Sequence, residues 1–380
     1  MPEAIRKQDL KTTAVNRWSR EPSAADVLLI ASLTCLMFVG LIVVNTKFSA
    51  LVDSFGDSSA YMSIASAIRQ WNFQNVVVKQ FWGLPYVMAA ISLVAHVSDR
   101  SALLLTSVAS SLVAVLLCYK LWGGWVAGFF AVLNFDWMQR SLLGGSEPLF
   151  MALLLGTFLA VRRERWLLAA LLSSCATIVR PLGFFALAGI GVALLRDRQF
   201  RRLAQAVAIA LAIAAVYVLP LAYAFGDPLA TVHSYQRPGQ SGPNLFGIPF
   251  YAIFKGTLLY PAPWTNLVLT FGWILFVTLG ATVMAVSRSF REYAKAHLVE
   301  ISFVLPYLIS IYCYNFPYWA RGSFPRFAIP VIPFVLVALR QWWPNDRRLL
   351  GGMAVASPLL AAVSALGVRN VLPIFQKLTG

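Results

Sequence analysis

The feature that most constrains this chain is the alternation of long apolar stretches with short clusters of basic residues. Hydrophobic residues make up 59% of the 380 residues, and charged residues only 12%. That much apolar surface exceeds what a soluble domain needs, and no polar stretch is long enough to contain a second core. We therefore expect an all-α polytopic membrane protein.

The formal net charge is +16, which taken alone would suit a protein that binds nucleic acid. The basic residues, however, fall in short clusters between apolar stretches, at 162–165, 196–202, 288–295 and 340–348. Cytoplasmic loops of membrane proteins carry such an excess of Lys and Arg. We therefore interpret the basic clusters as loops on the cytoplasmic side of the membrane. We expect no nucleic acid among the partners.

We predict about eleven transmembrane helices. They cover 27–44, 101–118, 121–135, 149–161, 166–179, 182–195, 203–225, 266–286, 298–314, 327–339 and 349–367. Residues 1–26 form a basic cytoplasmic tail, 27–367 a single transmembrane domain, and 368–380 an external tail. With the amino terminus in the cytoplasm, the loops 45–99 and 226–265 lie outside. The apolar segment 84–97 is too short to cross and is expected to lie in the interface.

The first predicted external loop contains Asp53 and Asp57, in a chain with only 15 acidic residues. Apolar side chains follow Asp57 at positions 61, 64, 65 and 68, the spacing of an amphipathic helix. A carboxylate at a helix start can serve as a cap that interacts with the helix dipole, or it can be a functional group. We adopt the functional interpretation because other charged residues fall on the same predicted side.

The predicted external loops also gather arginines and aromatic residues. A carboxylate can deprotonate a hydroxyl nucleophile, and arginines can hold a phosphate by bidentate contacts. This set suits transfer of a group from a membrane-bound phosphate donor to a hydroxyl acceptor. The acids in these loops are Asp53, Asp57, Asp136 and Glu147, and the bases are Lys79, Arg140, Arg180, Arg237, Arg321 and Arg326. We interpret Lys79, Arg140 and Arg321 as charges at the lipid surface.

Five short motifs occur in order along the chain. They are Gly56-Asp57-Ser58-Ser59-Ala60-Tyr61, Phe81-Trp82-Gly83-Leu84-Pro85-Tyr86, Ser146-Glu147-Pro148-Leu149-Phe150, Arg180-Pro181-Leu182-Gly183 and Pro325-Arg326-Phe327-Ala328-Ile329-Pro330. The series resembles the GT-C superfamily of integral-membrane glycosyltransferases, and its pattern is similar to bacterial relatives of the second GPI mannosyltransferase (PIG-V-like). The resemblance covers most of the chain. One departure is Gly56, where the PIG-V pattern has tryptophan.

The resemblance implies a GT-C-like bundle and a glycosyltransferase that uses a polyprenyl-phosphate-linked sugar, with mannose favoured. It implies an external active site and inversion at the sugar carbon. Asp57 would be the general base for an acceptor glycan, lipid or protein, and Glu147 would orient the acceptor or an arginine. The residues expected to bind the donor and its phosphate are Arg326, Arg180, Arg237, His233 and Tyr61.

Metal dependence stays open at the level of the sequence. Many GT-C enzymes have two adjacent acids, whereas here Asp53 and Asp57 are four residues apart. At that spacing they could share a Mg or Mn ion on one helical face, or Asp57 could act as a base without a metal.

Two other functions fit a chain of this composition. A transporter or lipid flippase should have charged residues deep within its spans, or broken helices in two matching halves, and the sequence has neither. A non-catalytic membrane assembly partner could carry the same motifs without activity, and the Gly56 departure leaves this interpretation open.

Overall fold

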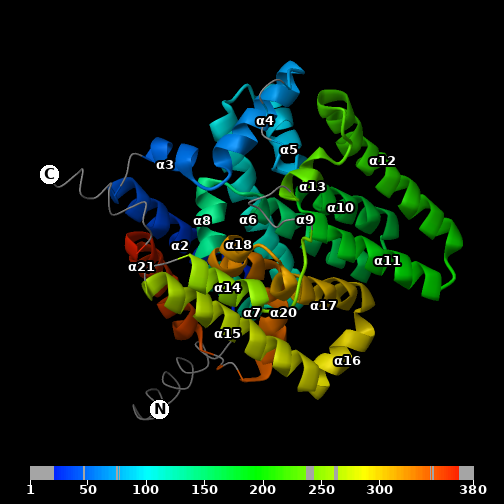
Figure 1. Cartoon of the computed structure of the whole chain (residues 1–380). Helices are drawn as coiled ribbons and strands as arrows, with labels where there is room; N and C mark the ends of the chain where they lie inside the picture. Colours follow the sequence, from blue (N-terminus) through cyan, green and yellow to red (C-terminus); the bar gives the residue numbers. More distant parts are fainter. Residues whose placement is uncertain are drawn as a thin grey trace, which may run out of the picture.

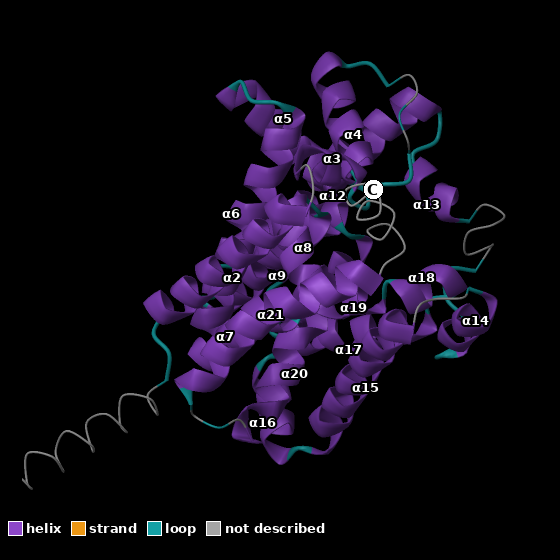
Figure 2. Ribbon diagram, turned by 90° about the vertical axis from the view of Figure 1, so that its left-hand side faces the viewer, coloured by secondary structure: helices purple, strands orange, loops and turns teal. Residues whose placement is uncertain are grey.

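The computed structural model describes residues 21–367, apart from 46–47, 74–75, 77, 237–243, 261–263, 343 and 345. The predicted external tail 368–380 and most of the predicted cytoplasmic tail 1–26 lie outside the described residues. All regular elements in the described part are helices, and an isolated β-bridge joins Phe246 to Tyr314 (Figure 2).

Four described helices are long and apolar enough to cross a membrane, judged by length and composition. They are α2 (Ala24–Asn45), α6 (Asp99–Trp122), α12 (Phe200–Phe225) and α15 (Trp264–Val286). Two bent pairs bring the number to as many as six. In one, α8 (Phe135–Leu143) meets α9 (Ser146–Arg162) at 106°, and in the other, α16 (Arg288–Ala296) meets α17 (Leu298–Cys313) at 117°.

The remaining apolar helices are shorter. They are α5 (Gly83–Ala95), α7 (Gly124–Leu133), α10 (Trp166–Val179), α11 (Phe184–Arg196) with η1 (Pro181–Gly183) before it, and the run α19 (Phe324–Ala328), η2 (Ile329–Val331) and α20 (Ile332–Leu339). The last long helix is α21 (Arg347–Gly367). Each predicted span falls on one of these helices, so the prediction of an all-helical, multi-pass membrane protein is confirmed.

One predicted span, 121–135, differs in form from the prediction. The preceding helix α6 continues to Trp122, and α7 then has only 10 residues. A helix of that length rises about 15 Å, half of a hydrocarbon core of about 30 Å. The break lies at Gly123, whose φ of +90° is open to glycine and strained for other residues. The chain then turns again, and 135–143, expected to be a loop, forms the helix α8.

Helix α9 lies at the centre of the bundle and packs against α6, α10 and α17. Its side chains are buried on most sides, as expected for a helix that is apolar all round. Phe158 on α9 contacts the rings of Phe303 on α17 and Phe334 on α20, with centroids 5.9 Å away in both cases. The core therefore joins segments that are far apart in the sequence.

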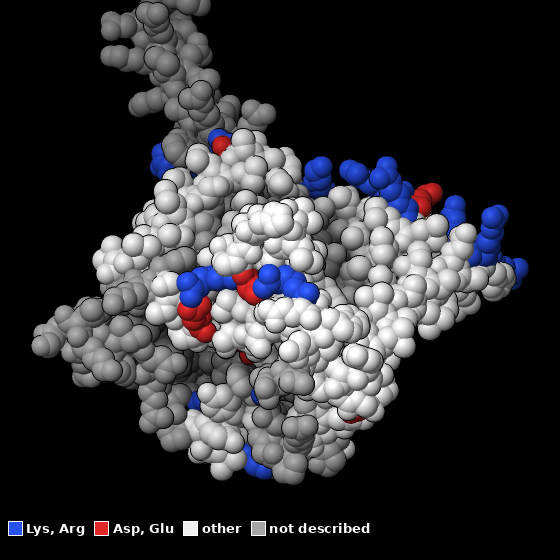
Figure 3. Space-filling model, turned by 90° about the horizontal axis from the view of Figure 1, so that it is seen from above, with Lys and Arg blue, Asp and Glu red and all other residues white. Residues whose placement is uncertain are grey.

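Five further short helices belong to the described part. They are α3 (Phe48–Ser54), α4 (Ser58–Gln70), α13 (Ala230–Tyr235), α14 (Tyr251–Leu259) and α18 (Pro317–Gly322). In two views at right angles, α4 lies at one end of the molecule and α16 at the opposite end (Figures 1 and 2). In the view from above, charged atoms form a few separate groups on a face of mostly uncharged residues (Figure 3).

Candidate functional site

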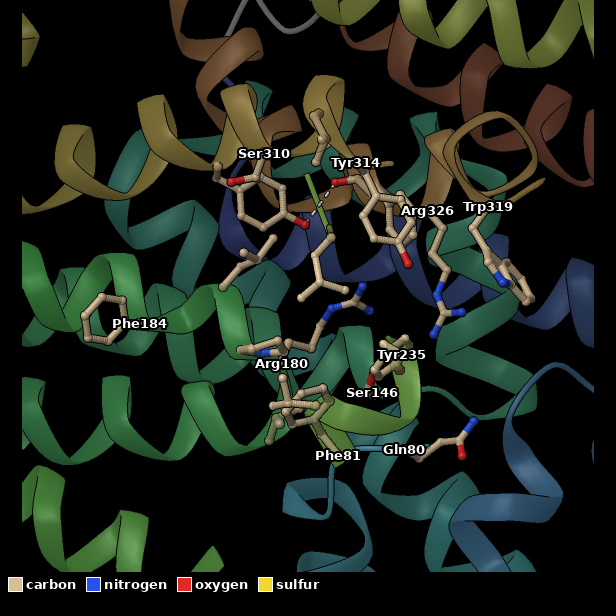
Figure 4. A pocket seen from close by; sticks show the side chains of 18 of the residues that line it. Gln80, Phe81, Ser146, Arg180, Phe184, Tyr235, Ser310, Tyr314, Trp319 and Arg326 are labelled. Atoms are coloured by element: carbon tan, nitrogen blue, oxygen red, sulfur yellow. Dashed lines mark hydrogen bonds between the residues drawn. The ribbon is translucent and has the colours of Figure 1, made fainter. Parts of the chain in front are cut away.

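A cavity of about 400 Å³ lies between the start of α4 and the ends of α10, α17 and α19. Its walls are mostly apolar, with charged and hydroxyl groups gathered in one part. The polar lining residues are Asp57, Tyr61, Lys79, Gln80, Ser146, Arg180, Tyr235, Tyr307, Ser310, Tyr314 and Arg326. Arg180 and Arg326 approach the same space from different segments, with Tyr235 and Gln80 nearby (Figure 4).

Asp57 stands at the turn just before α4. The turn is made by Gly56, which has a φ of +52°. Although Asp57 occupies the N-cap position, its side chain makes no capping hydrogen bond. It accepts instead from Gln80 Nε2 at 3.1 Å and from Arg326 Nη2 at 3.2 Å, and its side chain is 27% exposed. The structure thus directs Asp57 toward the cavity rather than toward its own helix.

Glu147 links the two arginines of the cavity. It follows Gly144 and Gly145 at the start of α9, and its side chain is 1% exposed. The carboxylate accepts hydrogen bonds from Arg180 Nη1 and Arg326 Nε, and it does not cap α9. A buried charge is tolerated when it is paired in this way. Glu147 therefore contacts both guanidinium groups of the cavity.

The backbone around Arg326 is held on both sides. Asn134 Nδ2 donates to the carbonyl of Pro325 at 3.0 Å, and the Tyr307 hydroxyl donates to the carbonyl of Phe327 at 3.1 Å. Asn134 also caps α8 through the Trp137 N–H at 2.9 Å. These bonds tie the short helix α19 to α8 and α17, and they determine where the guanidinium of Arg326 lies.

The charges around Asp57 control its protonation. Burial raises the pKa of this carboxyl, but the guanidinium groups of Arg326 and Arg140 lower it more, and the net pKa lies below the ordinary value. Asp57 is therefore ionised at neutral pH and can accept a proton.

Two predicted site residues, Asp53 and His233, are not part of this group. Asp53 accepts from Arg100 Nε at 2.9 Å and is 42% exposed. His233 is also exposed, and its Nδ1 lies 2.8 Å from Asp227 Oδ2. Arg237 lies outside the described residues. Within the described ranges, no group of three or more His, Cys, Asp or Glu residues is placed to hold a metal ion.

Two residues interpreted from the sequence as lipid-surface charges are buried, and that interpretation was wrong for them. Arg140 is 9% exposed, and Arg321 is 7% exposed and donates to the carbonyl of Tyr260 at 2.8 Å. Their burial comes from the packing of α8 and α18 against the bundle. The sequence shows only that they lie between apolar spans.

Lys79, interpreted from the sequence as a lipid-surface charge, lines the cavity instead, together with Gln80 and Tyr235, which were not selected as site residues. The Lys79 ammonium lies 5.9 Å from the ring centroid of Tyr235 and 5.4 Å from that of Trp319. Such cation–π contacts hold a lysine in place without neutralising its charge. The adjacent Lys79 and Gln80 in the polar interval before the apolar segment 84–97 were the available signal.

No protein-family model matches the chain, and no curated protein matches it by sequence. Among solved structures, it is similar to the crystal structure of ArnT from Cupriavidus metallidurans bound to undecaprenyl phosphate. The TM-score is 0.53 at 16% sequence identity, over 92% of this chain and 67% of that chain. This likeness shows a shared fold, and it agrees with the all-helical membrane bundle expected from the sequence.

Proposed function

We propose that this protein is a membrane glycosyltransferase that moves a sugar from a polyprenyl-phosphate donor to a hydroxyl acceptor. The observation that carries the proposal is the pairing inside one cavity of a partly exposed carboxylate, Asp57, with two oriented arginines, Arg180 and Arg326. A base and a phosphate-binding pair are the two groups that this reaction needs. The fold of ArnT, whose structure contains undecaprenyl phosphate, supports the same choice of donor.

The lining of the cavity suits a lipid-linked phosphate. Phe184 and Phe246 both line it, yet they are 55% and 50% exposed, so the cavity reaches the side of the bundle at these rings. An isoprenoid chain can lie there with its phosphate toward Arg180 and Arg326. Both arginines share their charge with Glu147, and Lys79 adds a cation that forms no ion pair with a described carboxylate. We assign Lys79 to the phosphate as well.

In the proposed reaction, the Asp57 carboxylate takes the proton of the acceptor hydroxyl. The acceptor oxygen forms a bond to the anomeric carbon as the bond from that carbon to the phosphate oxygen breaks. The polyprenyl phosphate leaves with the electron pair, and its added negative charge is stabilised by Arg326, Arg180 and Lys79. Attack opposite the leaving group inverts the anomeric carbon. By resemblance, we propose mannose as the sugar.

We further propose that the amino terminus is cytoplasmic and the cavity external. Ser63 and Ser289 are both exposed, and the helices that carry them, α4 and α16, lie at opposite ends of the molecule (Figure 1). A cysteine at position 63 should react with an impermeant thiol reagent added outside intact cells, and one at position 289 only after permeabilisation. The reverse pattern would place the cavity on the cytoplasmic side.

The decisive experiment is a transfer assay in membranes that contain the protein, with undecaprenyl-phosphate mannose, glucose and galactose tested separately. We expect Asp57→Asn to lower transfer by roughly 100-fold or more, since a positioned base contributes about 10²–10⁴-fold. Asp53→Asn is the matched control, because Asp53 pairs with Arg100 outside the cavity. Full activity of Asp57→Asn would remove this residue from the base role.

No transfer by the wild-type protein with any of the three donors would count against the proposed function. It would favour the transporter or the non-catalytic partner instead. Movement of a labelled undecaprenyl-phosphate sugar across proteoliposomes would then distinguish these two.

A further inference from the structure

Arg140 lies directly behind the turn that carries Asp57. It belongs to α8, and its guanidinium carbon is 4.7 Å from the ring centroid of Phe55. A Cβ built on Gly56, the residue before Asp57, would lie only 2.7 Å from Arg140 Nη1. The cation therefore rests against the backbone from which Asp57 projects.

Two glycines leave the space that Arg140 fills. At Gly56, both the short distance to Nη1 and the φ of +52° oppose a side chain. At Gly145, a Cβ would lie 2.8 Å from Arg140 Cδ and 2.9 Å from Glu147 Oε2. Contacts under 3.0 Å force a neighbour to move. The turn before α4 thus depends on a glycine to admit the guanidinium of Arg140, and the turn before α9 on a glycine to admit its aliphatic part.

Arg140 carries hydrogen-bonding capacity that no described residue uses. It is 9% exposed, and its Nε and Nη1 atoms lack a hydrogen-bond partner among the described residues. A buried guanidinium that is incompletely paired costs stability, so its presence calls for another explanation. The charged groups that act on Arg140 are Asp57, Asp136, Glu147 and Arg326.

In the proposed reaction, the guanidinium of Arg326 would have to bind the donor phosphate while it also holds Asp57. It donates to Glu147 through Nε and to Asp57 through Nη2. A phosphate in the cavity competes with Asp57 for the Nη2 group, because phosphate oxygens are strong bidentate acceptors for arginine. Asp57 then keeps Gln80 as a neutral partner, and a second cation is needed to hold its negative charge.

We propose that Arg140 is a positioning residue that keeps Asp57 ionised and in place when the donor phosphate draws Arg326 away. The inference rests on the proposed function and extends it to a residue that does not line the cavity. Arg140 acts through Asp57 and does not contact substrate.

Loss of the positive charge of Arg140 should raise the pKa of Asp57. Asp57 accepts a proton only in its ionised form, and a nearby cation favours that form. Neutralising Arg140 should therefore raise the pKa of Asp57, by about one unit for the loss of one opposite charge at short range. The acidic limb of the pH–rate profile should move to higher pH by the same amount.

The closest groups that could alter this titration lie on several elements around Asp57. They are Arg326 on α19, Arg140 on α8, Glu147 on α9, Tyr61 on α4, Gln80 and Lys79 before α5, Arg180 at η1 and Tyr235 on α13. All except Arg140 are left intact in the experiment, so their contributions cancel between variants.

The test compares wild type with Arg140→Met, Arg140→Lys and Arg321→Met in membranes, with and without undecaprenyl phosphate. The infrared band of the protonated carboxyl that disappears in Asp57→Asn reports the titration of Asp57 directly. We expect Arg140→Met to raise its midpoint by about one unit when undecaprenyl phosphate is present, and Arg140→Lys to recover most of that shift. Arg321→Met removes another buried arginine and should match wild type.

A midpoint in Arg140→Met equal to that of wild type would overturn the inference. If Arg140→Met does not accumulate in the membrane, Arg140→Gln takes its place. The infrared measurement needs no turnover, so failure of the proposed function appears as absent sugar transfer, whereas failure of this inference appears as an unshifted band. With an active donor, the pH–rate profile should move together with the band.

Discussion

Two arginine–glutamate groups, each built on a buried glutamate, join helices of this protein. They differ in how many of their polar atoms have hydrogen-bond partners. In the first, at the end of the bundle near α4, Glu147 bonds to Arg180 and Arg326 beside the cavity. In the second, Arg162 at the end of α9 contacts Glu300 at the start of α17, with Nε–Oε1 at 2.7 Å and Nη2–Oε2 at 3.1 Å. Both groups join helices that are distant in sequence.

The second group is closed. Arg162 also donates to the Leu121 carbonyl at 2.7 Å and to the Tyr293 hydroxyl at 3.0 Å, and Trp122 Nε1 donates to the same hydroxyl at 2.8 Å. The first group has spare capacity, because Glu147 Oε2 and two nitrogens of Arg140 lack partners among the described residues. A network in which every polar atom is paired serves stability, whereas the first group borders the cavity, where Arg180 and Arg326 face the space that a ligand can fill.

The largest effect is expected at the cavity. Arg326→Met should lower sugar transfer by roughly 10²–10³-fold, because it removes a donor that stabilises the leaving phosphate. The measurement is the rate of transfer per folded protein in membranes. Arg321→Met, which removes a buried arginine outside the cavity lining, should stay close to wild type. Equal losses in the two variants would mean that Arg326 acts through packing alone.

An intermediate effect, on stability, is expected in the closed group. Glu300→Gln leaves the half-buried Arg162 without its charged partner and should lower the free energy of unfolding by about 3 kcal/mol. Thermal unfolding in detergent measures this loss, and the transfer rate per folded molecule should remain near that of wild type. If Glu300→Gln lowered the transfer rate and left the free energy of unfolding unchanged, the second group would serve catalysis and not stability.

The smallest effect is expected from Lys79. Lys79→Met should raise the KM for the lipid donor by about tenfold with little change in kcat, as for loss of one charge-assisted contact made equally in ground and transition states. Initial rates at varied donor concentration provide the test. Lys255, which lies over the ring of Tyr251 outside the cavity lining, is the matched control. A change in kcat alone would assign Lys79 to the transition state instead.

Much of the fold could be predicted because membrane helices are encoded locally. A run of apolar residues makes a helix wherever it occurs in a bilayer, so the spans at 27–44, 203–225 and 266–286 coincide with α2, α12 and α15. The predicted span at 121–135 is a shorter helix in the structure, because the chain breaks at Gly123. That break depends on a positive φ angle, which hydropathy does not reveal. Hydropathy does not distinguish a crossing helix from a short buried one such as α7.

The candidate site was predicted in part. Asp57, Glu147, Arg180 and Arg326 were selected from motifs, and the structure brings all four together. His233 and Asp53 were selected by the same reasoning, but they pair elsewhere. In the sequence, these two residues have the same charged character and the same position between apolar spans as the four cavity residues. Only the partner that each side chain has in the folded protein distinguishes the two sets.

The sequence by itself determined that this chain forms a helical membrane bundle, because the required apolar length and the position of each basic cluster are properties of short segments. The tertiary structure decided which charges are buried together and which face lipid. Arg140 and Lys79 were alike as isolated charges between apolar spans, yet one lies behind Asp57 and the other lines the cavity. The energy of a charge depends on the neighbours and the solvent that folding places around it, and these come from distant parts of the chain.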